Sequence, residues 1–239
     1  MRKLLLLMLF VTLPAAAQSI EYYAGVSHSI QKPNSGNFIV SEGGDSFEFT
    51  PCSADGMDIV GANLSRVFCR RRDFHGFNLG AKYNLSKSFG IRADFSAYFD
   101  KTRAVDTFGT GADAHTDTNT FKDRTYILVA GPEFAAERGS WKPFVHLMGG
   151  FARQTSDDTQ TSTGPFAFSL HDRVTSPALK VGGGIDVRLT PKVALRIIEI
   201  DYNPIFARDR HVPGNADFDQ RVKGKTADNV TFTVGVVWH

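Results

Sequence analysis

Two neighbouring segments of this chain alternate between apolar and polar residues over an unusual length. The alternation runs from Phe74 to Leu85 and, after a tight turn at Ser86–Lys87, again from Phe89 to Asp100. Successive side chains of a β-strand point to opposite faces, so each segment presents one apolar and one polar face. Strands of roughly ten residues or more are long for a soluble sheet but can cross a bilayer at a tilt. The pattern predicts a β-hairpin and leaves open which face meets water.

The same alternation predicts six further strands. They lie at about residues 20–30, 124–137, 142–153, 177–189, 193–202 and 230–238. The segment at 142–153 is fairly apolar on both faces, so its orientation stays open. With the hairpin the total is eight, and single-chain bacterial barrels contain an even number of antiparallel strands. The predicted fold is all-β, an eight-stranded antiparallel up-and-down transmembrane β-barrel.

The lengths of the connections favour a membrane barrel. Three pairs of strands are joined by only a few residues, whereas the other connections are long. The long connections lie at about residues 31–73, 101–123, 154–176 and 203–229. Outer-membrane barrels have short periplasmic turns and longer extracellular loops. We therefore expect these four segments to be extracellular, and the apolar faces of the strands to meet lipid.

The alternation breaks once, within the strand predicted at 193–202. Arg196 has the opposite parity to Glu199 and Asp201. A β-bulge lets two residues of one strand oppose one residue of its neighbour. A bulge at Ile197–Ile198 is therefore predicted, because it would turn all three charged side chains to the interior.

The N-terminus carries the pattern of a secretory signal peptide. Arg2 and Lys3 precede a short apolar run, and an Ala-x-Ala sequence ends at Ala17 before Gln18. Cleavage between Ala17 and Gln18 would leave the barrel domain at 18–239 and export it to the outer membrane. Loss of Arg2 and Lys3 takes the 27 basic residues to 25, equal to the 25 acidic residues. This neutral balance gives no footprint for nucleic-acid binding.

The two cysteines, Cys52 and Cys69, both lie in the exported part of the chain. In an oxidising compartment they are expected to form a disulfide that closes a loop. Two free thiols remain an alternative. A metal pair is disfavoured, because the chain has no Cys-x-x-Cys sequence and no close histidine partner.

The polar faces of the predicted strands supply five bases and five acids to the barrel interior. They are Lys82, Arg92, Asp94, Glu133, Lys180, Asp186, Arg188, Arg196, Glu199 and Asp201. The interior of an eight-stranded barrel is just wide enough for side chains to fill. Buried charges must be paired, so the set predicts a packed, neutral plug without a bulk pore. A narrow ion path through these charges is the alternative.

Other residues have a structural explanation. Aromatic residues near strand ends suit a girdle at the membrane interface, with the candidates Tyr22, Tyr83, Phe89, Tyr126, Trp141, Tyr202 and Trp238. The run Gly182–Gly184 lies inside a strand and lacks the lysine and helix of a phosphate loop. The histidines His28, His75, His146 and His171 lack metal-ligand spacing. No metal or other cofactor is predicted.

Several of these features together resemble the small eight-stranded outer-membrane β-barrels of the OmpA and OmpX type. The resemblance covers about residues 18–239 and rests on the signal peptide, the hairpin segments 77–80 and 95–96, the segments 130–133 and 143–144, and the last strand. It implies that the barrel-insertion machinery reads an aromatic C-terminal signal. That signal comprises Val230, Phe232, Val234, Val236 and Trp238. The chain departs from the family because Trp238 is penultimate and His239 is last.

The predicted function is that of a monomeric, non-enzymatic barrel with a structural or surface-interaction role. Its expected partners are outer-membrane lipids and lipopolysaccharide, the insertion machinery, and an unidentified extracellular partner that the loops contact. A lipid-modifying enzyme is an alternative, with His28–Ser29 or Ser96 and Asp94 as candidate groups. A soluble binder of the lipocalin kind is a further alternative, because its strands alternate in the same way with the charged face outward.

Overall fold

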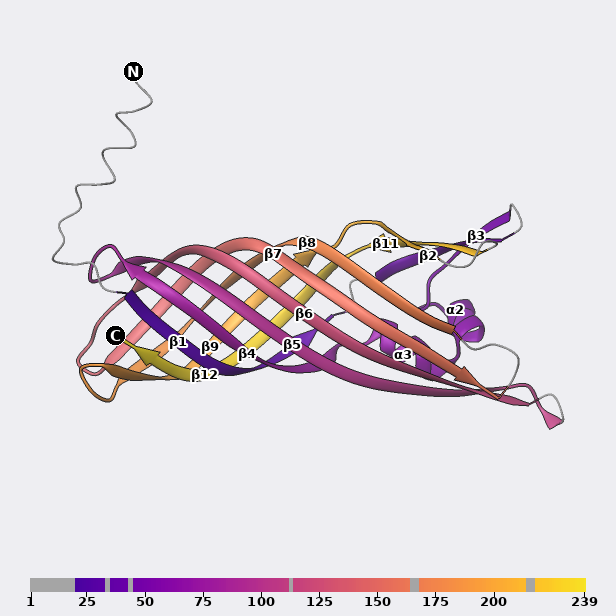
Figure 1. The fold of residues 1–239 in the computed structure, drawn as a ribbon, viewed down its shortest axis with the longest axis horizontal. Helices are drawn as coiled ribbons and strands as arrows, with labels where there is room; N and C mark the ends of the chain where they lie inside the picture. The colour runs from indigo at the N-terminus through magenta and orange to yellow at the C-terminus, as the bar shows by residue number, and fades with distance from the viewer. Residues whose placement is uncertain (1–19, 33–34, 43–44, 112–113, 164–167, 214–217) are drawn as a thin grey trace, which may run out of the picture.

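The computed structural model describes residues 20–32, 35–42, 45–111, 114–163, 168–213 and 218–239. Eight strands close into an antiparallel barrel in the order β1-β12-β9-β8-β7-β6-β5-β4 (Figure 1). They are β1 (Ile20–Gln31), β4 (Arg72–Asn84), β5 (Phe89–Phe108), β6 (His115–Ala135), β7 (Trp141–Ser162), β8 (Phe168–Arg188), β9 (Val193–Phe206) and β12 (Thr226–Trp238). The predicted fold class is confirmed. The proposed cleavage site at Ala17 and Gln18 lies outside the described residues.

The outer surface of the barrel is apolar and the interior is polar. The hairpin predicted from the alternating sequence is formed by β4 and β5. Its side chains of Phe77, Leu79, Ile91 and Phe95 are exposed on the outside. Lipid is the solvent that accepts such a surface. On β7, whose orientation the sequence left open, Phe144 and its alternate neighbours face inward. Among the described residues, no helix has the length and apolar character needed to cross a membrane.

Most of the expected girdle residues lie on this outer surface. The exposed ones are Tyr22, Tyr83, Trp141, Tyr202 and Trp238. Phe89 and Tyr126 are half-buried, Phe89 beside Phe134 and Tyr126 beside Phe95 and Phe99. In the last strand, Phe232, Val234 and Trp238 are exposed, whereas Val230 and Val236 are half-buried.

The predicted bulge is confirmed. On one side of β9, Ile185 of β8 pairs with Ile198 and Asp186 pairs with Arg196, which leaves Ile197 without a pairing partner in β8. The pairing of β9 with β12 shifts at the same place. Arg196 and Glu199 are therefore both buried, although their sequence parity differs.

Four strands are much longer than predicted. β5 pairs with β6 as far as Phe108 and His115, and β7 pairs with β8 through most of 154–176. The prediction ended these strands too early. Beyond the membrane both faces of a strand meet water or polar groups, so threonine, aspartate and arginine replace the apolar residues and the two-residue signal disappears.

The other two long connections contain a second layer of structure at the same end of the barrel. A four-stranded sheet joins β10 (Arg210–Pro213), β11 (Phe218–Gly224), β2 (Ser35–Glu42) and β3 (Asp45–Phe49). Two short helices follow, α2 (Ala54–Val60) and α3 (Ala62–Cys69). In Figure 1, β2, β3, β11, α2 and α3 lie at the right-hand end of the molecule, beside the extended barrel strands and opposite the end with the short turns. The alternation in the sequence predicts loops in these two connections and none of these elements.

Helix α3 is fixed to the inner face of the extended hairpin of β5 and β6. Val67 packs with Ala104 and Phe121 in a buried apolar cluster. The carboxylate of Asp106 accepts hydrogen bonds from the backbone N–H groups of Asn63 and Leu64, 2.9 and 3.0 Å away. These donors belong to the first helical turn, whose N–H groups have no acceptor within the helix. The first long connection is therefore docked on the barrel by apolar packing and by a helix cap from β5.

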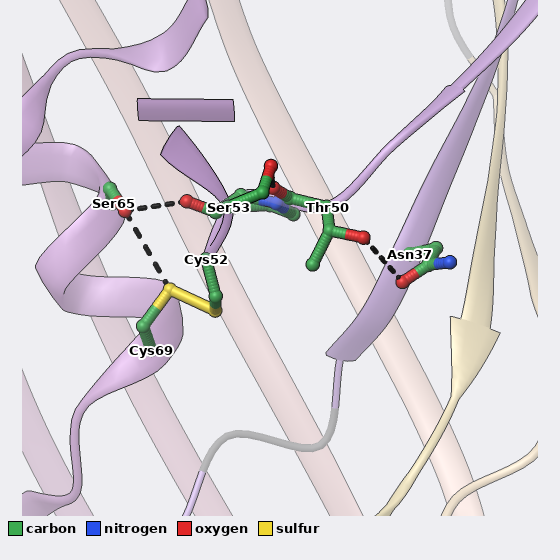
Figure 2. The surroundings of a disulfide bond; sticks show 7 residues. Asn37, Thr50, Cys52, Ser53, Ser65 and Cys69 are labelled. Carbon is green, nitrogen blue, oxygen red and sulfur yellow. Dashed lines mark hydrogen bonds between the residues drawn. A yellow bond between two sulfur atoms is a disulfide. The ribbon is translucent and has the colours of Figure 1, made fainter. Parts of the chain in front are cut away.

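The disulfide between Cys52 and Cys69 is formed, with the two Cα atoms 5.5 Å apart. Figure 2 shows it joining the end of α3 to the segment that leads into α2. The hydroxyl of Ser65 donates to the backbone carbonyl of Pro51 at 2.5 Å, beside the bond. A loop of 17 residues closed in this way is stabilised by about 3 kcal/mol in the chain-entropy model.

Candidate functional site

The centre of the barrel is occupied by one arginine that three carboxylates surround. The guanidinium of Arg92 donates to Asp94 at 2.7 Å, to Glu133 at 3.1 Å and to Glu199 at 2.7 Å. Arg92 is 1 % exposed, and its partners Asp94 and Glu199 are fully buried. Planar guanidinium groups suit several charge-assisted hydrogen bonds at once. This side chain therefore joins β5, β6 and β9 across the interior.

A second arginine lies between two aromatic rings. Arg196 donates to Asp186 through Nε at 2.8 Å and to Glu199 through Nη1 at 2.6 Å. Its guanidinium lies 4.5 Å from the ring centre of Tyr23 and 4.3 Å from that of Phe144. Cation–π contacts are stronger when they are shielded from water. The sequence does not predict this stacking, because the pattern of one strand does not indicate which residues face it across a barrel.

Two lysines complete the network. Lys180 lies 2.9 Å from Asp94 and 3.0 Å from Asp201, and Lys82 lies 2.8 Å from Glu133. Each of these residues is at most 3 % exposed. These side chains therefore have almost no surface that water can reach.

Glycines make room for this packing. A Cβ atom on Gly80 would lie 2.1 Å from the ring of Tyr23, and one on Gly182 would lie 2.1 Å from a carboxylate oxygen of Asp201. A Cβ on Gly184 would likewise lie 2.8 Å from the ring of Phe144. Gly182 and Gly184 therefore allow close packing inside the barrel, which is a usual role of glycine within a strand.

Nine of the ten charged residues predicted for the interior lie there, and Arg188 does not. Arg188 has the inward parity, but it is the last residue of β8, where the barrel opens to water. Its side chain is 46 % exposed and pairs with Glu137 at 3.0 Å. The prediction that Arg188 is an interior charge was wrong because parity alone does not show where a strand leaves the barrel.

The interior also contains a histidine that the sequence analysis did not assign to it. His146 of β7 is buried, with Nε2 2.9 Å from Asp201 and 4.0 Å from Glu199. These three residues have the spacing of a metal set, with ligand atoms within 4.8 Å of one another. Lys180 and Arg92 already contact the same carboxylates, so the chain itself supplies the positive charge there. The missing signal was the orientation of β7, which its own sequence does not reveal.

Above the network, the barrel opens into a cavity of about 90 Å³ that is lined mainly by polar and charged residues. Arg72 reaches into it and forms ion pairs with Asp100 and with Asp123, the latter at 2.6 Å. Asp172 on the opposite wall pairs with Arg210 at 2.7 Å. The full lining is Gln31, Lys32, Arg72, Phe74, Asp123, Arg124, Thr125, Gln154, Thr155, Ser156, Asp172 and Val174. We call this space the vestibule.

Acidic residues predominate on the inward face of the extended strands β5 to β8. They are Asp100, Asp106, Asp117, Asp123, Asp158 and Asp172. Burial, together with the neighbouring Asp123, raises the pKa of Asp158 from 3.8 to about 7. A shift in this direction is the expected result of crowding carboxylates where water is scarce.

The candidate groups for enzymatic activity are not assembled. His28 lies on the outer face beside His75 and Asp73, whereas Ser29 is buried inside and bonded to Thr231. Neighbouring residues of a strand point to opposite faces, so this pair cannot act together.

The second candidate pair, Ser96 and Asp94, is not arranged for catalysis either. Ser96 is buried on the inward face, and the carboxylate of Asp94 is held by Arg92 and Lys180. Neither pair forms a nucleophile and base.

The model of one protein family, the outer membrane protein beta-barrel domain, matches residues 4–239. The chain belongs to this family. It is an outer-membrane β-barrel of the Gram-negative type, so the end with short turns is the periplasmic end and the vestibule is extracellular. The lipocalin alternative is thereby excluded. No curated protein matches the chain.

Several solved structures of outer-membrane proteins are similar to this barrel. The protease OmpT of Escherichia coli is 11% identical, with 92% of this chain and 96% of that chain covered and a TM-score of 0.52. The attachment invasion locus protein Ail of Yersinia pestis is 14% identical, with 91% and 97% covered and a TM-score of 0.38. Neisserial surface protein A is 12% identical, with 91% and 96% covered and a TM-score of 0.40. At such identities the likeness shows the fold alone. Small barrels of this kind are mostly non-enzymatic, although OmpT is a protease.

Proposed function

We propose that this outer-membrane protein is a closed, non-enzymatic barrel that presents an ordered extracellular surface to a partner outside the cell. The observation that carries the proposal is the contrast between a sealed interior and a structured extracellular end. A pore would need an accessible interior, and a purely structural anchor would not need a second sheet, two helices and a disulfide above the membrane.

The sealed interior argues against transport. The side chains of Arg92, Lys180 and Glu199 are nearly inaccessible to water and hold one another by direct ion pairs. Separating buried charges leaves each of them without compensation, which costs several kcal/mol. Opening a path through them would require such a separation, so no ion passes at an appreciable rate.

The extracellular end has the properties of a recognition surface. Loops on a rigid scaffold usually carry binding residues. Here the first connection is tied to the barrel wall by the bond between Cys52 and Cys69, by the cap from Asp106 and by the packing of Val67. A preordered surface loses less conformational entropy when it binds. We place the partner contact on α2, α3 and the sheet of β2, β3, β10 and β11.

Assembly of the barrel belongs to the same proposal. The alternating outward residues Phe232, Val234 and Trp238 of β12 would be read by the insertion machinery. The barrel wall is complete within one chain, with β1 pairing β12. A monomer is therefore the form that we propose for the membrane.

Two measurements test the proposal. Purified protein in planar bilayers should give no sustained conductance, and a steady single-channel current would overturn the sealed interior. Cells that display the wild-type chain should adhere to immobilised matrix proteins more strongly than cells with residues 35–70 replaced by a short Gly-Ser linker. Equal adhesion, with both barrels folded in the membrane, would contradict the recognition role.

A further inference from the structure

The outward face of the barrel changes from apolar to cationic at one level. On β5, β6 and β7 the outward residues are apolar or aromatic from the periplasmic end up to Phe99, Tyr126 and Phe151. The next outward residue on each strand is a cation, in the same order Lys101, Arg124 and Arg153. The change falls where the hydrocarbon of the outer leaflet gives way to lipid headgroups.

Six exposed cations gather on this face, on four neighbouring strands. They are Lys101, Arg103, Lys122, Arg124, Arg153 and Arg173, which we call the basic belt. The register of the strands makes these cations neighbours. Lys101 of β5 pairs directly with Lys122 of β6. Thr155 of β7 pairs with Arg124 of β6 on one side and with Arg173 of β8 on the other. Directly opposed residues lie about 5 Å apart at Cβ, and like charges in that position repel.

The chain does little to neutralise the basic belt. On the outward face of the described parts of β5 to β8, Asp157 is the single carboxylate above the apolar band, and it lies 3.4 Å from Arg124. Asp157 also contacts His171 at 2.5 Å. No described carboxylate lies within ion-pair distance of Lys101, Lys122 or Arg153. Six cations and one carboxylate leave five positive charges on this face.

The opposite side of the barrel differs at the same level. There Lys32 pairs with Asp228 at 3.7 Å, and His28 pairs with Asp73 at 3.2 Å. Tyr202 also donates to Asp228 at 2.6 Å. On this side Asp73 and Asp228 each have a basic partner within the chain, whereas most cations of the basic belt have no acidic partner.

We propose that the basic belt binds the phosphate groups of lipopolysaccharide in the outer leaflet, so that this lipid occupies the β5 to β8 side in preference to the opposite side. Arginine and lysine suit phosphate through charge-assisted hydrogen bonds. The exposed rings of Phe99 and Phe151 lie just below the cations and can pack against acyl chains. The inference concerns a lipid neighbour in the membrane and goes beyond the recognition of an extracellular partner.

The test uses the full chain, purified in detergent and titrated with lipopolysaccharide before and after enzymatic removal of its lipid A phosphates. The variant is Lys122→Gln, Arg124→Gln and Arg153→Gln combined. The matched control removes three exposed cations from the periplasmic end, Lys87→Gln, Arg138→Gln and Lys192→Gln. Each cation near an anionic membrane surface contributes roughly fivefold in binding, so we expect about 100-fold weaker binding of the intact lipid by the belt variant. The control should bind like the wild type, and the dephosphorylated lipid should bind the wild type as weakly as the variant binds intact lipid.

Three outcomes would overturn the proposal. They are unchanged binding by the belt variant, an equal loss in the periplasmic control, and equal binding of intact and dephosphorylated lipid. A parallel titration with a sulfated polysaccharide distinguishes a soluble polyanion, because strong belt-dependent binding of that probe without binding of the lipid would assign the surface to a different ligand. Heat modifiability on gels shows that each variant is folded, and none of these results bears on the adhesion assay.

Discussion

The strands β5 to β8 cross two environments, and their two halves have opposite chemistry on the same faces. In the membrane half, apolar residues such as Leu128 and Phe95 face outward, and Arg92 with its carboxylates faces inward. In the extracellular half, cations face outward and aspartates line the vestibule. The backbone is continuous and the parity is unchanged. The surrounding medium, and not the strand geometry, therefore decides which residues each face carries.

The two halves also treat charge differently. Inside the membrane half, every predicted charge that is buried has a partner at ion-pair distance, because an unpaired charge there would be prohibitive. In the extracellular half, water and ions screen the side chains, so clusters of one sign can persist. The difference predicts that equal substitutions in the two halves have unequal effects.

The largest effect is expected for Arg92→Met. The substitution leaves three carboxylates around an uncharged side chain, and breaking a buried ion pair from one side costs about 3–5 kcal/mol. Urea unfolding in lipid vesicles, followed by tryptophan fluorescence, measures the loss in the free energy of unfolding. Arg124→Met, an equal change on the exposed outer face, should alter it by less than about 0.5 kcal/mol. Similar losses in both variants would break the comparison.

The next largest effect is expected in the extracellular half alone. Replacing both Cys52 and Cys69 with serine removes the loop closure, which stabilises the folded form of that segment by about 3 kcal/mol. Limited proteolysis should cut the chain between α2 and β4 far faster than in the wild type. The urea midpoint of the barrel itself should not move, and a lower midpoint would show that the two halves are coupled.

A smaller effect is expected for Gly80→Ala. The added Cβ would collide with the ring of Tyr23, which the guanidiniums of Arg92 and Arg196 hold in place. Overpacking of this kind costs about 1–3 kcal/mol. Gly149→Ala is the control, because the nearest atom to its new Cβ is 3.6 Å away. Thermal unfolding in detergent should separate the two variants, and equal midpoints would mean that the ring moves freely.

The smallest effect on the barrel as a whole is expected from pH, because it acts locally, at the two neighbours Asp157 and Asp158. Burial raises the pKa of Asp158 to about 7, so the folded chain holds this proton more tightly than the unfolded chain. Local stability should therefore fall as the pH rises from about 4 to 7, and Asp158→Asn should abolish that fall. The rate of amide hydrogen exchange in β7 at pH 5 and at pH 8 measures this change in local stability. A pH dependence that persists in Asp158→Asn would contradict the assignment.

The outward neighbour provides the contrast. The hydrogen bond from His171 lowers the pKa of Asp157, so this carboxylate adds stability above its ordinary pKa and loses it only as the medium turns acidic. Asp157→Asn should therefore leave the exchange rates at pH 5 and pH 8 in the same ratio as in the wild type. A changed ratio would show that the two faces are not electrostatically separate.

The sequence predicted the membrane half well and the extracellular half poorly. Lipid on one face and packed charge on the other produce a regular pattern, from which eight strands and the bulge at Ile197–Ile198 could be inferred. Where water meets both faces the pattern is lost, so the extended strands and the second sheet were missed.

Within the site, parity identified the interior charges, but the rim position of Arg188 and the place of His146 were not readable. Both depend on how strands align across the barrel. The stacking of Arg196 on Tyr23 and Phe144 likewise joins strands that are far apart in sequence.

The unbroken register from membrane to extracellular tip also restricts how this protein can diverge. A single residue inserted in β5 before Asp100 would exchange the two faces of the rest of that strand, exposing Asp100 and Asp106 and burying Lys101 and Arg103. An insertion of two residues would keep the faces and only lengthen the wall. Length changes of any size should be tolerated at the hairpin tip near Gly109 and Gly111, whose positive φ angles mark the turn. Related chains should therefore differ in even steps along these strands and freely at their tips.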